Sequence, residues 1–153
     1  MRSLLLAVLT SAISVSAFAA PRVYPGAKAA GVIIGEPTAL SGKYWLEPDR
    51  AIDGALGFGF GREGGLYVHS DYLFHTMRAY QLGTEVFNLF YGPGVRAKFG
   101  EKDFRMGIRG AFGTSYYFRG APLEVFAELG PIFDLSPGTE FSMTGGIGLR
   151  YTF

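Results

Sequence analysis

The segment from Phe104 to Phe118 decides the fold, and it reads FRMGIRGAFGTSYYF. Strict alternation of two unlike sets of residues is typical of a β-strand whose two faces meet different surroundings. One face carries Phe104, Met106, Ile108, Gly110, Phe112, Thr114, Tyr116 and Phe118, and the other carries Arg105, Gly107, Arg109, Ala111, Gly113, Ser115 and Tyr117. No helical periodicity competes with this pattern. The segment therefore predicts a long strand with one apolar face and one face of charges and small residues.

The same alternation recurs along the chain. Seven further segments are strand candidates: Ala30–Glu36, Ser41–Leu46, Ala51–Phe60, Leu66–His75, Phe87–Phe99, Leu123–Leu135 and Phe141–Phe153. Turn-forming Gly, Pro and Asp residues fill most connections between them, and Thr76–Thr84 is the one longer connection. Eight strands without a helix predict an all-β fold.

The first residues have the features of a secretory signal peptide. A basic start is followed by the apolar segment Leu4–Val15 and by the small-x-small cleavage site Ala17-Phe18-Ala19. This apolar segment is shorter than the ~20 residues that a membrane-spanning helix needs. We therefore expect residues 1–19 to be a cleaved signal peptide, 20–29 a periplasmic lead-in and 30–153 the barrel.

Composition excludes several classes of function. The chain of 153 residues has 14 Lys and Arg against 13 Asp and Glu, a balance that argues against a nucleic-acid-binding module. It has no Cys, which excludes a disulfide framework, a thiol nucleophile, a Cys-ligated metal and a lipid-anchored lipoprotein. We expect a monomer that binds no nucleic acid.

Two kinds of barrel fit alternating strands, because the apolar face can point inward, as in a lipocalin-like carrier, or outward, as in a membrane barrel. Glycines share their face with Arg and Glu, a mixture that suits a narrow interior filled by side chains. Aromatic residues also end the apolar rows, as Phe104 and Phe118 do. Twelve tilted residue steps rise about 30 Å, near the height of a membrane barrel's apolar band. We predict an eight-stranded antiparallel up-and-down transmembrane β-barrel with a side-chain-filled interior.

Several motifs resemble known outer-membrane proteins. The chain is similar to the small eight-stranded bacterial barrels of the OmpA transmembrane-domain and OmpX kind. More narrowly, five motifs resemble a family of uncharacterised bacterial barrels: Gly35–Thr38 (GEPT), Lys43–Leu46 (KYWL), Ala51–Ala55 (AIDGA), Ala121–Leu123 (APL) and Gly146–Tyr151 (GIGLRY). The alternating residues Ile147, Leu149, Tyr151 and Phe153 resemble the C-terminal assembly signal of such barrels.

This resemblance extends over nearly all of the chain after the signal peptide. It implies a location in the bacterial outer membrane and insertion by the barrel-assembly machinery. The expected partners are outer-membrane lipid and lipopolysaccharide. The narrower family implies no activity.

The predicted inward face is rich in charge. Its members are Lys43, Asp53, His69, Asp71, Arg96, Lys98, Arg105, Arg109, Glu124, Glu128, Asp134 and Arg150. An unpaired buried ion is costly, so we expect a network of ion pairs that fills the lumen. The strand of Glu124 and Glu128 is predicted to lie between the cationic strands and the strand of Arg150. The alternative is a path for ions or small solutes.

Three sequence features could instead indicate a chemical site. His69, Asp71 and His75 share a face and could hold a metal or relay a proton, but no fourth ligand is evident, so network membership is favoured. Residues 59–64 (GFGREG) match G-x-G-x-x-G, yet strand alternation resumes after them where a dinucleotide site needs a helix. Adjacent His69 and Ser70 point to opposite faces and cannot form a base–nucleophile pair. We predict no catalytic residue, cofactor or metal.

The expected function is a non-enzymatic structural or surface-interaction role in the outer membrane. The alternatives are a narrow ion or small-solute channel and, after it, an outer-membrane lipid-modifying enzyme. The outer loops are expected to be short, at Pro37–Leu40, Gly61–Gly65, Gly100–Asp103 and Ser136–Glu140. They offer little area for a tall adhesive surface.

Overall fold

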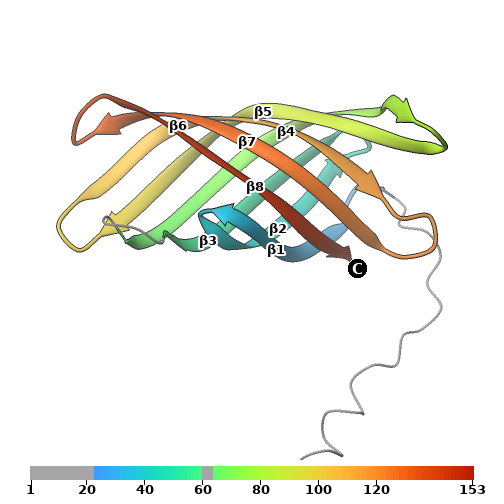
Figure 1. The fold of residues 1–153 in the computed structure, drawn as a ribbon, viewed down its shortest axis with the longest axis horizontal. Coiled ribbons are helices and arrows are strands. Elements are labelled where there is room, and N and C mark those ends of the chain that lie inside the picture. The colour runs from blue at the N-terminus through green and yellow to red at the C-terminus, as the bar shows by residue number, and fades with distance from the viewer. Residues whose placement is uncertain (1–22, 60–63) are drawn as a thin grey trace, which may run out of the picture.

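A computed structural model describes residues 23–59 and 64–153, so the expected signal peptide and the start of the Gly61–Gly65 loop lie outside the described residues. Eight antiparallel strands close into a barrel in which each strand pairs with its neighbours in sequence (Figure 1). They are β1 (Lys28–Glu36), β2 (Thr38–Glu47), β3 (Arg50–Gly59), β4 (Gly65–Leu82), β5 (Glu85–Gly100), β6 (Phe104–Tyr117), β7 (Leu123–Ser136) and β8 (Glu140–Thr152). In the described part, no helix has the length and apolar character required to cross a membrane.

The pairing register gives the barrel its stagger. The pairs can be followed once around the wall, through Ala29, Lys43, Asp53, Asp71, Gly94, Arg109, Ile132 and Ser142. On β8, Ser142 precedes Gly145 by three residues, and Gly145 pairs with Glu36 of β1. Because the two strands are antiparallel, Ser142 is level with a point three residues after Glu36, which is position 39. The circuit that began at Ala29 has therefore shifted by ten residues (39 − 29). This stagger tilts the strands and sets the bore, which for eight strands is just wide enough for side chains.

The apolar face of every strand points outward, as the sequence predicted. Phe104, Ile108 and Leu149 are 47%, 54% and 43% exposed, whereas Arg109 and Glu128 are 3% and 6% exposed. A water-soluble carrier would have the opposite arrangement. The outer surface is therefore apolar and the charges fill the interior.

β4 is longer than the sequence indicated. The region Thr76–Thr84, expected to be a connection, continues β4 and β5 as a two-stranded ribbon up to the pair Leu82↔Glu85. A register shift between Thr76 and Tyr80 contains Arg78, whose φ of 55° is left-handed. A bulge of this kind interrupts the alternation of residues, so the sequence pattern does not indicate a strand there. β1 is also longer than expected, because it begins at Lys28, two residues before Ala30.

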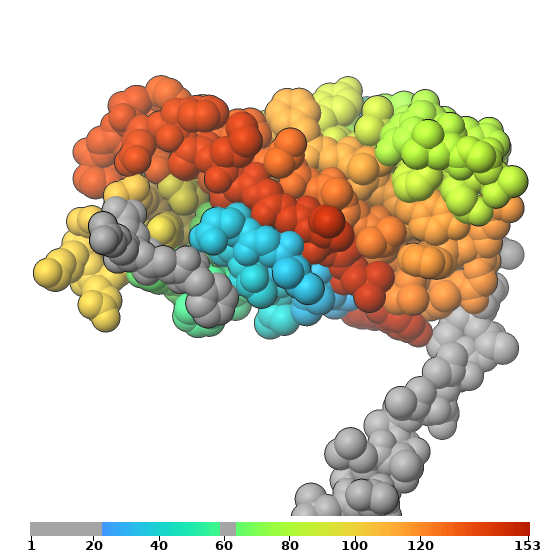
Figure 2. Space-filling view, viewed as in Figure 1, coloured from blue at the N-terminus to red at the C-terminus, as the bar shows by residue number. Residues whose placement is uncertain are grey.

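The barrel has two unlike ends. At the terminal end β1 begins and β8 finishes; the connections β1–β2, β3–β4, β5–β6 and β7–β8 lie at the opposite, far end (Figure 1). The far rim is uneven, because β1 pairs with β8 only as far as Glu36↔Gly145. In the described residues, β8 from Glu140 to Thr144 pairs with β7 alone. Figure 2 shows the short blue β1–β2 hairpin beside the longer orange and red β7–β8 hairpin.

A substitution at Gly148 on β8 would test how tightly the interior is packed. A Cβ atom added there would lie 2.2 Å from the ring of Phe126, on which the guanidinium of Arg150 stacks at 3.8 Å. We expect Gly148→Val to lower the free energy of unfolding by about 1–3 kcal/mol through overpacking. Urea unfolding of refolded protein, followed by heat-modifiable gel mobility, measures this. Gly138→Val is the control, because no heavy atom lies within 4 Å of its added Cβ; equal midpoints for the two variants would contradict the packing.

Candidate functional site

Arg109 lies at the centre of the lumen and joins two acidic residues. Its guanidinium extends from β6, with Nη1 2.5 Å from Asp71 Oδ2 on β4 and Nη2 2.8 Å from Glu128 Oε1 on β7. Gly94 lies between Asp71 and Arg109 in the pairing, and a Cβ there would be 1.8 Å from Asp71 Oδ1. The absent side chain of Gly94 therefore allows an ion pair to form over the intervening strand.

A second centre, nearer the terminal end, is built on Arg150. Its Nη2 is 2.8 Å from Asp53 Oδ2, its Nε donates to Ser41 Oγ at 2.8 Å, and its Nη1 lies 3.8 Å from Glu124 Oε2. The other oxygen of Glu124 accepts from Lys43 Nζ at 2.8 Å. These side chains come from β2, β3, β7 and β8, so the group links opposite walls of the barrel.

A third pair lies toward the far end. Arg96 on β5 forms a two-point ion pair with Asp134 on β7, in which Nε is 3.1 Å from Oδ1. The residue between them in the pairing is Gly107, and an added Cβ there would be 2.7 Å from Asp134 Oδ1. The geometry is therefore the same as at Gly94: a glycine in the middle strand lets charges on the flanking strands meet.

The pairing follows the neighbour-to-neighbour scheme that the sequence suggested at Arg109–Glu128 and Arg150–Glu124, but not elsewhere in the lumen. Ten of the twelve expected members are buried in the lumen, and nine of those ten are charged groups held in the three sets above. The tenth is His69, described below. The remaining two, Lys98 and Arg105, are half-buried near the far rim, where Arg105 Nη1 is 3.1 Å from the exposed Glu140. Most ion pairs join strands that are not adjacent.

The terminal end is closed by a cluster that the sequence analysis missed. Trp45, Ala27 and Ala51 are almost fully buried, with Val23 and Tyr117 packed against them. The backbone of the lead-in is tied to β2, because Gly26 N donates to Trp45 O at 2.8 Å and Trp45 N donates to Ala27 O at 2.9 Å. The signal that could have found this plug is the single Trp of the chain at an inward strand position.

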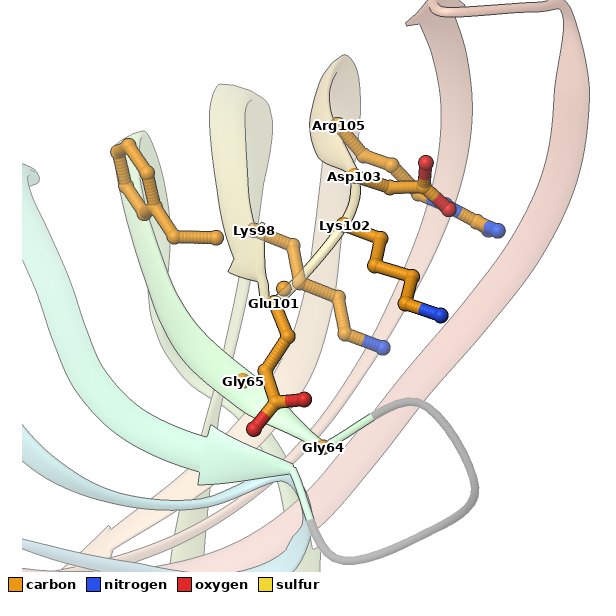
Figure 3. A pocket seen from close by; sticks show the side chains of 9 residues that line it. Gly64, Gly65, Lys98, Glu101, Lys102, Asp103 and Arg105 are labelled. Atoms are coloured by element: carbon orange, nitrogen blue, oxygen red, sulfur yellow. The ribbon is translucent and has the colours of Figure 1, made fainter.

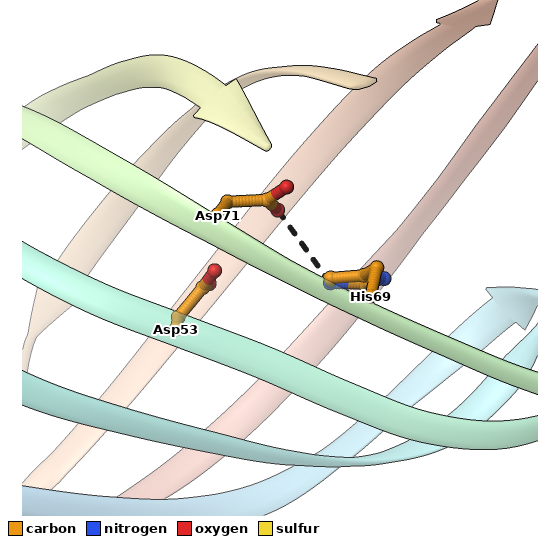
Figure 4. Close-up of side chains that lie close together, drawn as sticks. All are labelled: Asp53, His69 and Asp71. Atoms are coloured by element: carbon orange, nitrogen blue, oxygen red, sulfur yellow. Dashed lines mark ion pairs between the residues drawn. The ribbon is translucent and has the colours of Figure 1, made fainter. Parts of the chain in front are cut away.

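His75 belongs to this plug rather than to a metal site. Its ring centroid is 4.4 Å from that of Trp45 and 5.7 Å from that of Phe90. The residue that lies beside His69 and Asp71 is Asp53 instead of His75 (Figure 4). The possible ligand atoms of Asp53, His69 and Asp71, which are all buried, lie within 4.8 Å of one another. His69 Nε2 is 3.6 Å from Asp71 Oδ2.

This three-residue cluster has the donor types of a metal site, but its carboxylates are already engaged. Asp53 binds Arg150 and Asp71 binds Arg109 through charge-assisted contacts. Oδ1 of each aspartate has no hydrogen-bond partner among the described residues, but a cation bound there would be repelled by the two guanidinium groups. The arrangement therefore fits membership of the ion-pair network.

Glu128 is a direct test of that network. We expect Glu128→Ala to lower the free energy of unfolding by about 1.5–3 kcal/mol, because a buried Arg109 loses one of its charged acceptors. Equilibrium unfolding in urea measures the change. Glu140→Ala is the matched control: it removes the exposed partner of Arg105 and should cost under about 1 kcal/mol. Indistinguishable losses would exclude a stabilising role for the lumen pairs.

Scans of the chain against protein-family models and against curated proteins found no match. Among solved structures, the chain is similar to the N-terminal beta-barrel domain of Pseudomonas aeruginosa OprF, with a TM-score of 0.57 and 16% sequence identity. The match covers 83% of this chain and 96% of that one. The chain therefore shares with that domain the closed eight-stranded antiparallel barrel fold that its sequence predicted.

Proposed function

We propose that the chain is a monomeric integral protein of the bacterial outer membrane with a non-enzymatic structural or surface-interaction role. The outward apolar residues support this location, because they would contact acyl chains while the ion pairs stay inside. The likeness to the OprF barrel domain supports it at the level of fold. Outer-membrane lipid and lipopolysaccharide are the proposed contacts, and the barrel-assembly machinery is the proposed partner during insertion.

The observation that carries the non-channel role is the filled lumen. Three sets of ion pairs follow one another between the two ends, and the Trp45 cluster closes the terminal end. Passage of a solute would require separation of buried opposite charges, which costs several kcal/mol per pair. The described residues therefore favour a plugged barrel over a channel.

Planar-bilayer conductance tests this role. Refolded protein at modest salt is expected to insert without discrete openings, because the buried ion pairs and the Trp45 cluster occupy the lumen. Protease protection on proteoliposomes from the same preparation verifies insertion. Discrete single-channel steps from inserted protein would favour the ion or small-solute channel and overturn the proposal.

The enzyme alternative has no support in the site geometry. His69 points into the lumen, where it is buried, while the neighbouring Ser70 is on the outer face. A base and a nucleophile must lie within hydrogen-bond reach of each other, and these two side chains lie on opposite sides of the wall. We therefore assign no catalytic residue.

The membrane location itself predicts a depth-dependent cost on the outer face. Leu129, 57% exposed, lies near the middle of β7, and Leu135, 56% exposed, lies near its far end. Leu129→Arg should cost about 2–4 kcal/mol in bilayers, and Leu135→Arg about 0–1 kcal/mol, because burial of charge in hydrocarbon depends on depth. Unfolding from lipid vesicles measures both. Equal small effects would indicate that water, not lipid, surrounds the wall.

A further inference from the structure

Asp53 and Asp71 lie side by side in the middle of the lumen (Figure 4). They are direct partners on β3 and β4, and both are almost fully buried. Arg150 contacts Oδ2 of Asp53, and Arg109 contacts Oδ2 of Asp71. The Oδ1 atom of each aspartate has no hydrogen-bond partner in the part of the chain that the structure describes. Like charges directly opposite each other destabilise a sheet, so this pair requires a compensating charge.

The centre of the lumen contains one acid more than it has bases. Its buried charged groups are, on the acidic side, Asp53, Asp71, Glu124 and Glu128 and, on the basic side, Lys43, Arg109 and Arg150. Both guanidinium groups are already shared between two acids each. Sharing distributes the positive charge but does not add to it. A buried charge without compensation is costly, so the centre requires one further positive charge.

The cations nearer the far end do not supply this charge. Arg96 is engaged at two points by Asp134. Lys98 lies four residues along β5 from the partner of Asp71, roughly 13 Å away, and Arg105 is its direct partner on β6. Both are half-buried and line a cavity of about 820 Å³ at the far rim, which also contains acidic side chains (Figure 3). The acidic residues at this rim are Glu101, Asp103 and Glu140.

A proton can balance the centre, and two kinds of group could hold it. His69 Nε2 lies 3.6 Å from Asp71 Oδ2, and neither ring nitrogen of His69 has a hydrogen-bond partner among the described residues. A proton on this ring would place a third cation near Arg109 and Arg150, and the two carboxylates would still oppose each other. Two carboxyl groups at one site characteristically share a single proton, which removes that repulsion directly. The geometry therefore favours the aspartate pair over the histidine.

We propose that Asp53 and Asp71 form a proton-binding site, in which the two carboxyl groups share one proton at neutral pH. His69 then stays neutral beside them. The unfolded chain has no such pair, so the folded barrel holds one proton more than the unfolded chain does. Stability therefore falls as the pH rises above neutral. The other titratable groups around the pair are Lys43, Tyr67, His69, Arg109, Glu124, Glu128 and Arg150.

Carbon-13 spectra of protein labelled at the aspartate carboxyl carbons test this site, because a neutral carboxyl group and a carboxylate differ in chemical shift. The chain has five aspartates, and each Asp→Asn variant identifies its own signal. In refolded protein in octyl glucoside micelles at pH 7.5, the signals of Asp53 and Asp71 should be displaced toward the neutral-acid position. Together the two displacements should amount to one proton.

The variants Asp71→Asn and Asp53→Asn each remove the excess acid. In either variant the signal of the remaining aspartate of the pair should return to the carboxylate position. Asp49→Asn, an exposed change of the same chemistry, is the matched control and should leave both signals displaced. Two ionised aspartates in the wild type would overturn the proposal, because a bound monovalent cation, or a proton on His69 or Glu128, would then balance the centre instead.

Unfolding in urea measures the extra proton independently. Between pH 7 and 8, the unfolding equilibrium constant of the wild type should rise relative to that of Asp71→Asn, by up to about tenfold, since unfolding releases the shared proton. The histidines of the unfolded chain titrate in the same way in both proteins, so their contribution cancels. The asparagine oxygen can still accept from Arg109, and heat-modifiable gel mobility verifies that each variant folds. The same pH dependence in the wild type and both asparagine variants would contradict the site. Neither experiment requires a bilayer, so both are independent of the conductance and vesicle tests.

Discussion

The constraint on which the structure depends is that charge buried in a narrow cylinder must be neutralised there. An eight-stranded wall leaves room for side chains and little else, so water cannot solvate the carboxylates of the lumen. Arg109 meets this requirement for two acids at once, since its two Nη atoms contact Asp71 and Glu128. Arg150 does the same for Asp53 and Glu124. A guanidinium can bridge in this way because its donors are arranged in a planar fork, which a lysine lacks.

Glycine determines which charges can meet. Gly94 separates Asp71 from Arg109 in the pairing, and Gly107 separates Arg96 from Asp134. A Cβ at either position would collide with the carboxylate of that pair. These two inward glycines therefore do more than provide space: each allows an ion pair to form between the two strands that flank its own strand. This explains why Gly94 and Gly107 share a face with the charges that they separate.

How much of this the sequence could predict depends on whether a feature is local. Side-chain direction follows a period of two, so the residues from Phe104 to Phe118 predict their own faces without knowledge of the rest. Partner choice is not local: Lys43 and Glu124 are 81 residues apart, and their contact depends on the registers of all intervening strands. The bulge at Arg78 interrupts the alternation that would have extended β4. The plug at Trp45 depends on Val23 and Ala27, which precede the strands.

The side chains that stabilise the barrel also block the passage of solutes through its lumen. From the terminal end to the far end, the interior passes from an aromatic and apolar cluster through neutralised ion pairs to a cavity lined by the β5–β6 hairpin. A path through the barrel would require Lys43 to leave Glu124, Arg150 to leave Asp53, and Trp45 to move from beneath them. Each separation exposes a charge to a medium of low dielectric constant, so the losses act together against opening. The far cavity lies beyond this network and can therefore vary in shape and charge without loss of the pairs that hold the wall.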